Sequence, residues 1–302
     1  MFEPHVILGI IDSAIERNKV FGDLLTPENK TFLVNNSLIR PAETGEVLCH
    51  QNQADNTLYL IIDGEVEVSK VTDGRFTLLG ILGAGELIGE ISVLYMMPRI
   101  ATVTVTQPSI VLEIPSEVFT SMLRENPDVQ NAVLRRCKQR VIETSIRCVP
   151  IFNELDGQSF SELCQLSSLA KADQGVVVAH EGQIERSMYV ICSGTARVYI
   201  TVNGKEVNIA LLHPGDYFGE YSLFTGEARS ASVSALTDLQ LVELKGESFH
   251  SFIDYNEDAE YKISLESFQR QDQLELMRDS LIARQAAERR LSQVQNMLST
   301  TI

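Results

Sequence analysis

The sequence predicts an α+β fold made of two tandem jelly-roll β-barrels, each flanked by helices, with a long C-terminal helix. Three observations predict it: a repeat with a period of 130 residues, short runs of β-type residues between glycine turns, and apolar stripes with helical spacing after each predicted barrel. The parts expected along the chain are an N-terminal helix, a first domain with its linking helix, a second domain and a C-terminal helix, over residues 1–20, 21–147, 148–260 and 261–302.

The repeat sets the expected number of domains. Gly89, Glu90 and Arg99 recur 130 residues later as Gly219, Glu220 and Arg229. A period of this length is typical of a duplicated domain, because solenoid units repeat every ~20–50 residues. The same offset, without a gap, relates further glycine, histidine, aromatic and polar positions, namely Gly45/Gly175, His50/His180, Tyr59/Tyr189, Gly64/Gly194, Gly74/Gly204, Gly85/Gly215, Glu113/Glu243, Phe119/Phe249 and Asn126/Asn256.

The first copy begins with a helix and continues with short strands. Residues 7–19 predict an amphipathic helix with Ile7, Ile11 and Ile15 on one stripe. Strands are expected over residues 46–49, 57–62, 65–71 and 76–82. Hairpin turns are expected at dipeptides typical of tight β-turns, which are Asp63-Gly64, Asp73-Gly74 and Asn203-Gly204. Many short strands joined by tight turns indicate a jelly roll or a closed barrel.

Helical segments follow each predicted barrel. In the first copy, Ser116 is expected to cap one helix, and Asn126 is expected to cap the next, which runs to about Ile146. In the second copy a helix restarts at Asn256, and residues 259–300 predict one long polar helix. Its interrupted apolar spacing fits two structures, a coiled-coil homodimer or a helix folded onto its own domain. The apolar stripe of the helix in the first copy consists of Val129, Val133, Cys137, Val141 and Ile142.

Composition limits the classes of partner. The 302 residues carry 41 acidic and 25 basic side chains, a net charge of −16, so nucleic acid and anionic membrane surfaces are not expected as partners. No apolar run approaches the ~18 residues of a membrane-spanning helix, and the N-terminus lacks the basic start of a signal peptide. We therefore expect a cytoplasmic protein with reduced cysteines. We expect no metal site, since His50 and His180 have no neighbouring ligands in sequence.

The stretch from Phe218 to Ser232 combines groups that suit a phosphorylated sugar. A short helix is expected to begin near Gly219, and free N–H groups at a helix start can bind an anion. Arg229 offers a planar fork of donors to a phosphate, and Glu220 offers acceptors to a sugar hydroxyl. The alternative is a surface salt bridge beside a glycine turn. The second copy of the stretch favours the binding site.

At these residues the chain resembles a known family. The pattern Gly-Glu-(apolar)-Ser followed by Arg-x-Ala, preceded by Gly-x-x-x-Gly-Glu, is similar to the phosphate-binding cassette of cyclic nucleotide-binding domains. Tandem copies are similar to the regulatory subunit of the cyclic-AMP-dependent protein kinase, and single-copy relatives include the bacterial catabolite activator family. The resemblance covers residues 21–145 and 150–270.

The resemblance implies roles for the repeated residues. Glu90 and Glu220 would accept a hydrogen bond from the ribose 2′-hydroxyl, and Arg99 and Arg229 would bind the cyclic phosphate. The backbone N–H groups that complete the phosphate cradle would be those of Ile91, Ser92, Tyr221 and Ser222. No cofactor other than the nucleotide ligand is expected. The full expected set is Gly89, Glu90, Ile91, Ser92, Arg99, Ile100 and Ala101 in the first copy, and Gly219, Glu220, Tyr221, Ser222, Arg229, Ser230 and Ala231 in the second.

Two departures separate the copies. Ile100 stands where the second copy has Ser230, a hydroxyl position that in the family reaches the phosphate or a guanine base, and Met96-Met97 replaces Gly226-Glu227. They leave open whether the first site binds the same nucleotide, a different one or none. No Arg-Arg-x-Ala/Ser pseudosubstrate precedes the first domain, so kinase inhibition through such a segment is not expected.

The expected function is that of a cyclic nucleotide sensor. Cyclic AMP is the favoured ligand, and the signal would pass through ligand-driven helix movement to a protein effector that the sequence does not identify. No catalytic motif accompanies the two sites, so an enzyme is not expected. The alternatives are a cyclic GMP or cyclic di-GMP receptor, and a transcription regulator of the catabolite activator type without a recognisable DNA-binding domain. A homodimer through the C-terminal helix also stays open.

Overall fold

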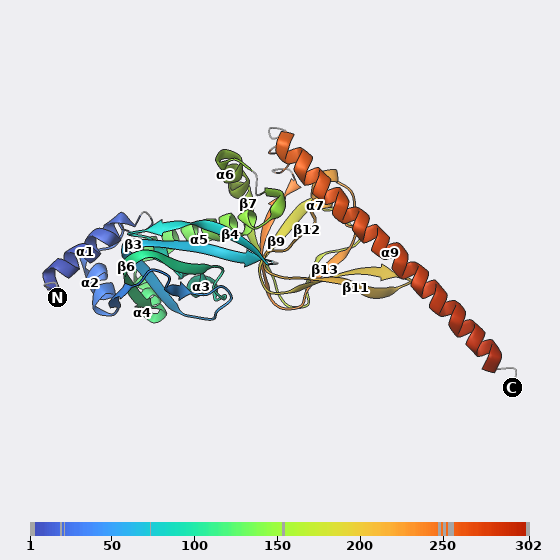
Figure 1. The fold of residues 1–302 in the computed structure, drawn as a ribbon, viewed down its shortest axis with the longest axis horizontal. Helices are drawn as coiled ribbons and strands as arrows, with labels where there is room; N and C mark the ends of the chain where they lie inside the picture. The colour runs from blue at the N-terminus through green and yellow to red at the C-terminus, as the bar shows by residue number, and fades with distance from the viewer. Residues whose placement is uncertain are drawn as a thin grey trace. The chain divides into compact units, whose positions relative to one another are not determined.

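The computed structural model describes residues 4–18, 20, 22–72, 74–152, 155–246, 249, 252 and 257–299. The chain divides into two compact units, Met1–Cys148 and Val149–Ile302, each built from antiparallel strands with helices beside them (Figure 1). The second unit ends in one long helix. The predicted α+β class, with two β domains flanked by helices and a C-terminal helix, is therefore confirmed.

The first unit begins with two helices and continues with one antiparallel sheet. The strands of this sheet run in the order β1-β6-β3-β4, with β2 paired to β6 and β5 paired to β3. The helices are α1 (Pro4–Arg17), α2 (Pro27–Asn35), α3 (Glu90–Tyr95), α4 (Ser116–Glu125) and α5 (Pro127–Arg147). The strands are β1 (Leu38–Ala42), β2 (Val47–Cys49), β3 (Thr57–Thr72), β4 (Arg75–Gly83), β5 (Leu87–Ile88) and β6 (Thr102–Pro115).

The second unit places eight strands in two four-stranded antiparallel sheets. One sheet has the order β11-β10-β13-β8 and the other the order β12-β9-β14-β7. The strands are β7 (Ser167–Ala172), β8 (Val177–Ala179), β9 (Ser187–Ser193), β10 (Ala196–Val202), β11 (Lys205–Leu212), β12 (Tyr217–Phe218), β13 (Ser232–Ala235) and β14 (Leu239–Lys245). The helices are the single turn η1 (Pro150–Phe152), α6 (Gly157–Gln165), α7 (Glu220–Thr225) and α9 (Glu257–Ser299).

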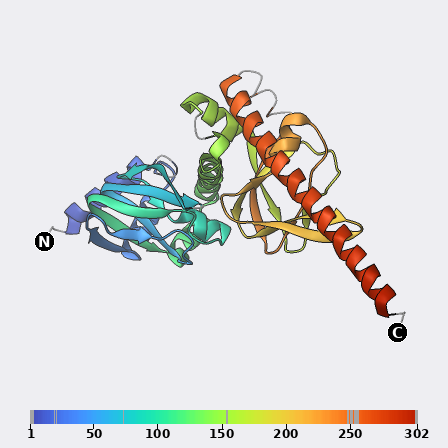
Figure 2. The same cartoon turned by 45° about the vertical axis from the view of Figure 1, so that its right-hand side comes forward.

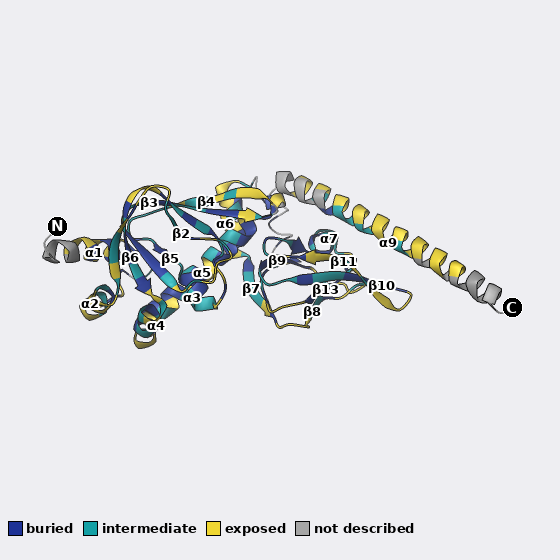
Figure 3. Cartoon of the chain, turned by 60° about the horizontal axis from the view of Figure 1, so that its bottom comes forward, coloured by how far each residue is buried: buried dark blue, intermediate teal, exposed yellow. Residues whose placement is uncertain are grey.

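Alternating side chains build the core of each unit. In the second unit, one apolar cluster takes Ile191 and Leu241 from one sheet and Val233 and Leu212 from the other, so it fills the space between the two sheets. The corresponding cluster of the first unit contains Ile61, Val66, Val103 and Val111. Figure 3 shows these strands largely buried, as expected when one face of each strand points inward.

The expected hairpin at Asp63-Gly64 is wrong. Residues 57–72 form the single strand β3, and its pairing with β6 shifts register on both sides of Asp63. Gly64 has a φ of +97°, and an added Cβ would overlap the Ser109 side chain. This glycine therefore serves a β-bulge in a continuous strand and not a turn. At the other two positions the hairpins are confirmed: Gly74 lies between the paired strands β3 and β4, and Asn203-Gly204 lies between β10 and β11, whereas Asp73 is outside the described residues.

The helices α4 and α5 begin near the predicted positions, but the expected capping contacts are not the ones observed. Ser116 is the first residue of α4 and not its cap, because the N-cap position is Pro115. Asn126 does precede α5, but its side chain makes no capping hydrogen bond. Instead its Oδ1 accepts from Nδ2 of Asn29 at 2.7 Å, and its Nδ2 donates to the carbonyl of Met122. Asn256 lies outside the described residues.

The long C-terminal helix expected from the sequence is α9, which Figures 1 and 2 show as one continuous rod. Its first part packs on its own unit through contacts with α7 and η1. Beyond Arg278 the described side chains are mostly exposed, including Ile282 and Leu291 (Figure 3). The first part therefore fits a helix folded onto its own domain. None of the helices in the described part of the chain is long and apolar enough to cross a membrane.

Candidate functional site

Each repeated Gly-Glu dipeptide begins a short helix. Gly89 precedes α3 with a φ of +92°, and Gly219 precedes α7 with a φ of +88°. Only glycine adopts this left-handed conformation without strain. At both positions an added Cβ would overlap the guanidinium of the repeated arginine. The glycine therefore lets the arginine side chain lie directly against the start of the helix.

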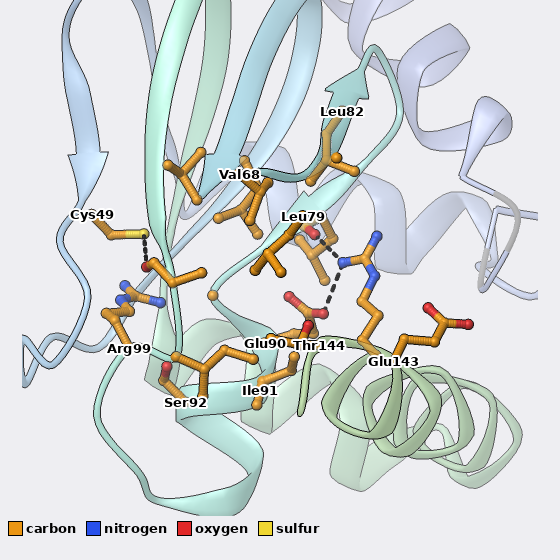
Figure 4. Close-up of a pocket in the computed structure, with 18 of the residues that line it drawn as sticks. Cys49, Val68, Leu79, Leu82, Glu90, Ile91, Ser92, Arg99, Glu143 and Thr144 are labelled. Carbon is orange, nitrogen blue, oxygen red and sulfur yellow. Dashed lines mark hydrogen bonds and ion pairs between the residues drawn. The ribbon is translucent and has the colours of Figure 1, made fainter. Parts of the chain in front are cut away.

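The first unit holds a pocket of about 330 Å³ at this point (Figure 4). One wall consists of barrel residues, among them Val68, Leu79 and Leu82, and the other is the inner face of α5. Figure 4 shows Arg99 on one side, Glu143 and Thr144 on the other, and Glu90 between them. All seven residues expected at the first site line this pocket, namely Gly89, Glu90, Ile91, Ser92, Arg99, Ile100 and Ala101.

The second unit holds a smaller pocket of about 170 Å³ at the matching place. Its barrel wall includes Val198, Ile209 and Leu212, and its outer wall is α9 with Arg270, Gln271 and Leu274. All seven residues expected at the second site line it, namely Gly219, Glu220, Tyr221, Ser222, Arg229, Ser230 and Ala231.

Arg99 is buried with part of its guanidinium unpaired. Its Nη2 forms an ion pair with Oδ2 of Asp55 at 3.0 Å and donates to the carbonyl of Thr57. Its Nε and Nη1 have no hydrogen-bond partner among the described residues. Burial alone would raise the pKa of Asp55, but the backbone N–H of Thr57 and the Arg99 guanidinium together lower it. Asp55 is therefore a carboxylate that holds the arginine in place.

Arg229 is less well paired. Its Nη1 donates to the carbonyl of Gly219 at 3.2 Å, and Nη2 lies 3.8 Å from Oε2 of Glu185. Within the described residues, Nε and Nη2 lack a hydrogen-bond partner, although only 4% of the residue is exposed. Burial lowers the pKa of this guanidinium, and the charge of Glu185 opposes that shift. A buried cation with unpaired donors is costly unless an anion binds it.

The repeated glutamates are each paired with an arginine from the helix that follows the barrel. Oε1 of Glu90 lies 2.9 Å from Nη1 of Arg140 on α5, and Oε1 of Glu220 lies 2.9 Å from Nη1 of Arg270 on α9. Arg140 also pairs with Glu86. The sequence prediction missed both arginines. They obey the same 130-residue offset as the rest of the repeat, which was the signal available to find them.

Additional contacts join α9 to the second pocket. Oγ of Ser230 donates to Oε1 of Gln271 at 2.5 Å. The ring of Phe268 packs edge-on against Tyr221 and Phe224 of α7, with centroid distances of 5.7 and 6.3 Å. The outer wall of this pocket is therefore fastened to the same segment that carries Glu220 and Arg229. A conformational change in that segment would therefore alter its contacts with α9.

The departures of the first copy are visible in its geometry. Met96 has a φ of +51° where Gly226 has +74°, so a methionine occupies a left-handed position that favours glycine. Its side chain is almost fully exposed. Ile100 lines the pocket where Ser230 lines the other, so it cannot repeat the contact with a helix amide. These differences lie at the edges of the pocket and leave the arginine and glutamate in matching places.

The chemistry of both pockets suits binding of an anion with a hydroxylated sugar. Burial raises the pKa of Cys49, which lines the first pocket, to about 11, so this thiol is not a nucleophile near neutral pH. No group of three metal-ligating side chains was found among the described residues. What both pockets do share is a buried guanidinium, a buried carboxylate and an apolar wall.

Replacing Arg140 by leucine is expected to destabilise the first unit by about 3 kcal/mol, because Glu90 is then a buried carboxylate without its partner. Arg270→Leu should cost only about 1 kcal/mol, since 37% of the Arg270 side chain is exposed against 15% for Arg140. Urea unfolding followed by hydrogen exchange, which separates the two units, measures both. Equal costs for the two variants would contradict this account.

The family model described as cyclic nucleotide-binding domain matches the chain twice, at residues 39–126 and 170–256. The chain is 28% identical to a cAMP-dependent protein kinase regulatory subunit of Blastocladiella emersonii, over 79% of this chain and 58% of the relative. It is 26% identical to a cGMP-dependent protein kinase of Caenorhabditis elegans, over 81% of this chain and 30% of the relative. The chain thus spans about six tenths of the length of the regulatory subunits it matches.

Two solved structures align with the chain at low TM-scores. The regulatory domain of Toxoplasma gondii PKA with cAMP aligns over 89% of this chain and 99% of that chain, with 19% identity and a TM-score of 0.41. The catabolite activator protein of Thermus thermophilus aligns over 44% of this chain and 62% of that chain, with 27% identity and a TM-score of 0.39.

Proposed function

Because this chain belongs to the family of cyclic nucleotide-binding domains and carries two copies of the domain, we propose that it is a non-enzymatic sensor whose main ligand is cyclic AMP. One observation supports this proposal above the others. In each pocket a buried arginine, Arg99 or Arg229, keeps two guanidinium nitrogens without a hydrogen-bond partner among the described residues. A cyclic phosphate supplies the oxygen acceptors and the negative charge that such a group lacks.

The glutamates complete the proposed binding mode. Glu90 and Glu220 are buried and face the pockets, and a carboxylate has about four lone-pair sites, so each can accept from a ribose hydroxyl while still paired with its arginine. The backbone N–H groups of the two short helices lie beside the phosphate position. The apolar barrel wall would take the base. The fourteen residues named from the sequence are thus proposed as the ligand-binding residues.

Signal transfer is proposed to run through α5 and α9. Arg140 and Arg270 connect these helices to the glutamates, so a ligand that changes the carboxylate contacts changes the helix contacts as well. A ligand shifts such an equilibrium only by the difference between its affinities for the two states. The output is contact with a protein effector. The names of the regulatory-subunit relatives favour a protein kinase as that effector, and they agree with the expectation that the chain is not an enzyme.

Titration calorimetry tests the proposal. Cyclic AMP is expected to saturate the protein at two equivalents. The 2′-deoxy analogue should bind about tenfold more weakly, because one hydrogen bond to a charged carboxylate is lost. Linear 5′-AMP is the control for the ring phosphate, and cyclic GMP and cyclic di-GMP test the alternative ligands. Absence of saturable binding by any of the three cyclic nucleotides would overturn the proposal.

A further inference from the structure

We propose that the distal part of α9, residues 279–299, is an interface between two copies of this chain, and that the two helices run antiparallel. The partner is a second copy, recognised by a stripe of apolar and charged side chains that matches itself when one helix is reversed. The inference goes beyond nucleotide binding, because none of the residues that carry it lines either of the two pockets.

The distal part of α9 extends beyond the contacts with its own unit. Arg278 pairs with Glu181 of the turn after β8, and α9 continues for 21 residues from there to Ser299. At 1.5 Å per residue this part is about 30 Å long. Figures 1 and 2 both show it reaching past the strands of its unit. A helix of this length is only marginally stable in water by itself, so a partner that covers one face would stabilise it.

One stripe of this helix has the spacing of a coiled coil. Met277, Leu281, Arg284, Glu288 and Leu291 follow one another at intervals of four, three, four and three residues, which places them on one face of a helix with a seven-residue repeat. The side chains of Met277 and Leu291 are 53% and 62% exposed. We call Leu281, Arg284, Glu288 and Leu291 the tail seam. Exposed apolar side chains at this spacing indicate a face that packs against another helix.

Two opposite charges lie in the middle of the tail seam. The side chains of Arg284 and Glu288 are 78% and 61% exposed, and Nε of the arginine lies 3.1 Å from Oε1 of the glutamate within the same helix. An exposed pair of this kind contributes little to helix stability, and the basic residue comes first, which is the less favourable order. Charged or polar side chains at positions that a coiled coil otherwise fills with apolar ones specify how the helices are paired.

The tail seam is symmetric about Ala286. Leu281 and Leu291 each lie five residues from it, and Arg284 and Glu288 each lie two residues from it. When two copies pack antiparallel with Ala286 at the same level in both, each leucine of the seam meets a leucine of the second copy, and each Arg284 meets Glu288 of the second copy. An interface around a two-fold axis requires this kind of self-complementary surface.

A parallel pair of the same helices would be repulsive. Parallel helices in register place equal positions opposite each other, so Arg284 would face Arg284 of the second copy, and Glu288 would face Glu288. Like charges opposite each other across an interface disfavour that arrangement. The chain as a whole carries a net charge of −16, which also opposes association without a specific attractive contact. The charge order of the tail seam therefore selects the antiparallel pair.

Sedimentation equilibrium on the full chain tests the dimer. The wild type should dimerise, and Arg284→Glu or Glu288→Arg should each raise the dissociation constant of the dimer by about tenfold or more. A 1:1 mixture of these two variants should restore the wild-type affinity. Opposite charges then face each other at both contacts between the helices, although each variant has like charges within its own helix. Arg290→Glu, at an exposed position outside the tail seam, is the matched control for charge reversal.

Cysteine cross-linking tests the orientation. In the antiparallel dimer, a mixture of Leu281→Cys and Leu291→Cys chains should form a disulfide on oxidation. Either variant alone should not, because its two new cysteines would be separated by ten residues, about 15 Å along the helix axis. A parallel dimer would give the reverse result. The five natural cysteines are buried, and the wild type oxidised in parallel gives their background.

Each result decides for or against the dimer. Weakening by either charge reversal, recovery on mixing and cross-linking only in the mixed cysteine pair support the proposal. A wild type that stays monomeric at all concentrations, a dimer insensitive to both reversals, or cross-linking of Leu281→Cys alone overturns it. Melting temperatures verify that the variants are folded. Titration with cyclic AMP reports the sensor function separately, so failure of the dimer and failure of the proposed function are distinguishable.

Discussion

Arg229→Met is expected to weaken cyclic AMP binding at the second site by about 100- to 10,000-fold and to leave the ligand-free protein at least as stable as the wild type. The loss of affinity follows because two charge-assisted hydrogen bonds disappear, each worth about 1.5–3 kcal/mol, and each 1.4 kcal/mol is a factor of about ten. The gain or neutrality in stability follows because a buried guanidinium with unpaired donors is exchanged for an apolar side chain of similar length.

The opposite signs of these two effects make the test informative. Replacing a residue that only stabilises the fold would lower the stability of the protein. Replacing a residue whose partner is a bound anion lowers the affinity for that anion without lowering the stability of the ligand-free protein. Arg99→Met is the matched comparison, because Arg99 has a firm ion pair with Asp55 at 3.0 Å while Arg229 lies 3.8 Å from Glu185. Arg99→Met should therefore also cost about 1 kcal/mol of stability. Calorimetry gives the affinities, and urea unfolding gives the stabilities.

The pH dependence of the Arg99 site has a definite sign. The pKa of Asp55 is lowered in the folded protein, so its contribution to stability is present above its unfolded pKa and is lost as the pH falls through the folded value.

Unchanged second-site affinity in Arg229→Met would contradict the assignment of this arginine to the ligand. A large drop in ligand-free stability for the same variant would show that Arg229 has a structural role instead.

Gly219→Ala is expected to destabilise the second unit by about 2–3 kcal/mol and to abolish cyclic AMP binding there. The backbone at Gly219 has a φ of +88°, where alanine is strained, and the new Cβ would lie 2.6 Å from the carbonyl oxygen of Ser187 and overlap Arg229. The carbonyl belongs to the backbone of β9 and cannot move away cheaply. Arg229 would therefore be displaced from the position that a phosphate requires.

Gly204→Ala is the matched control for this variant. Gly204 has a φ of +76°, but nothing lies within 4 Å of an added Cβ at that turn. It should show only the conformational cost of about 1 kcal/mol, with unchanged nucleotide affinity. Thermal unfolding and calorimetry on both variants distinguish the cost of the strained backbone from the cost of steric overlap between the new Cβ and its neighbours. Equal behaviour of Gly219→Ala and Gly204→Ala would show that the close approach of glycine and arginine does not matter.

The sequence predicted those features that depend on local chemistry and on the repeat. The duplicated Gly-Glu and Arg placed two sites on two β domains, and all fourteen expected residues line the two pockets. The prediction failed at Asp63-Gly64, because a glycine with positive φ serves a bulge as readily as a turn, and only strand pairing distinguishes them. Asn126 preceded a helix as expected, but its side chain found Asn29, a residue distant in sequence.

The missed residues belong to helices whose packing the sequence does not specify. The sequence alone does not distinguish Arg140 from the other polar residues of α5, and only the structure shows that it lines the pocket. Arg270 was similarly hidden in a helix whose interrupted apolar pattern fitted either a coiled coil or a cover over the second barrel. The repeat offset pointed to Arg140 and Arg270, but a shared offset indicates equivalence and not contact. Only the short distances in the structure show that Arg140 pairs with Glu90 and that Arg270 pairs with Glu220.

The helix α5 covers the first pocket and is also the segment that continues, after Arg147, into η1 at the start of the second unit. Any coupling between the two pockets that runs along the backbone passes through this junction, and it is measured as the change in the affinity of one site when the other site is occupied. Thermodynamic reciprocity then requires the second ligand to alter the affinity of the first by the same factor. Inserting a few flexible glycines between Arg147 and Pro150 would make the two titrations independent and abolish any cooperativity, while each pocket kept its own complement of ligand-binding groups.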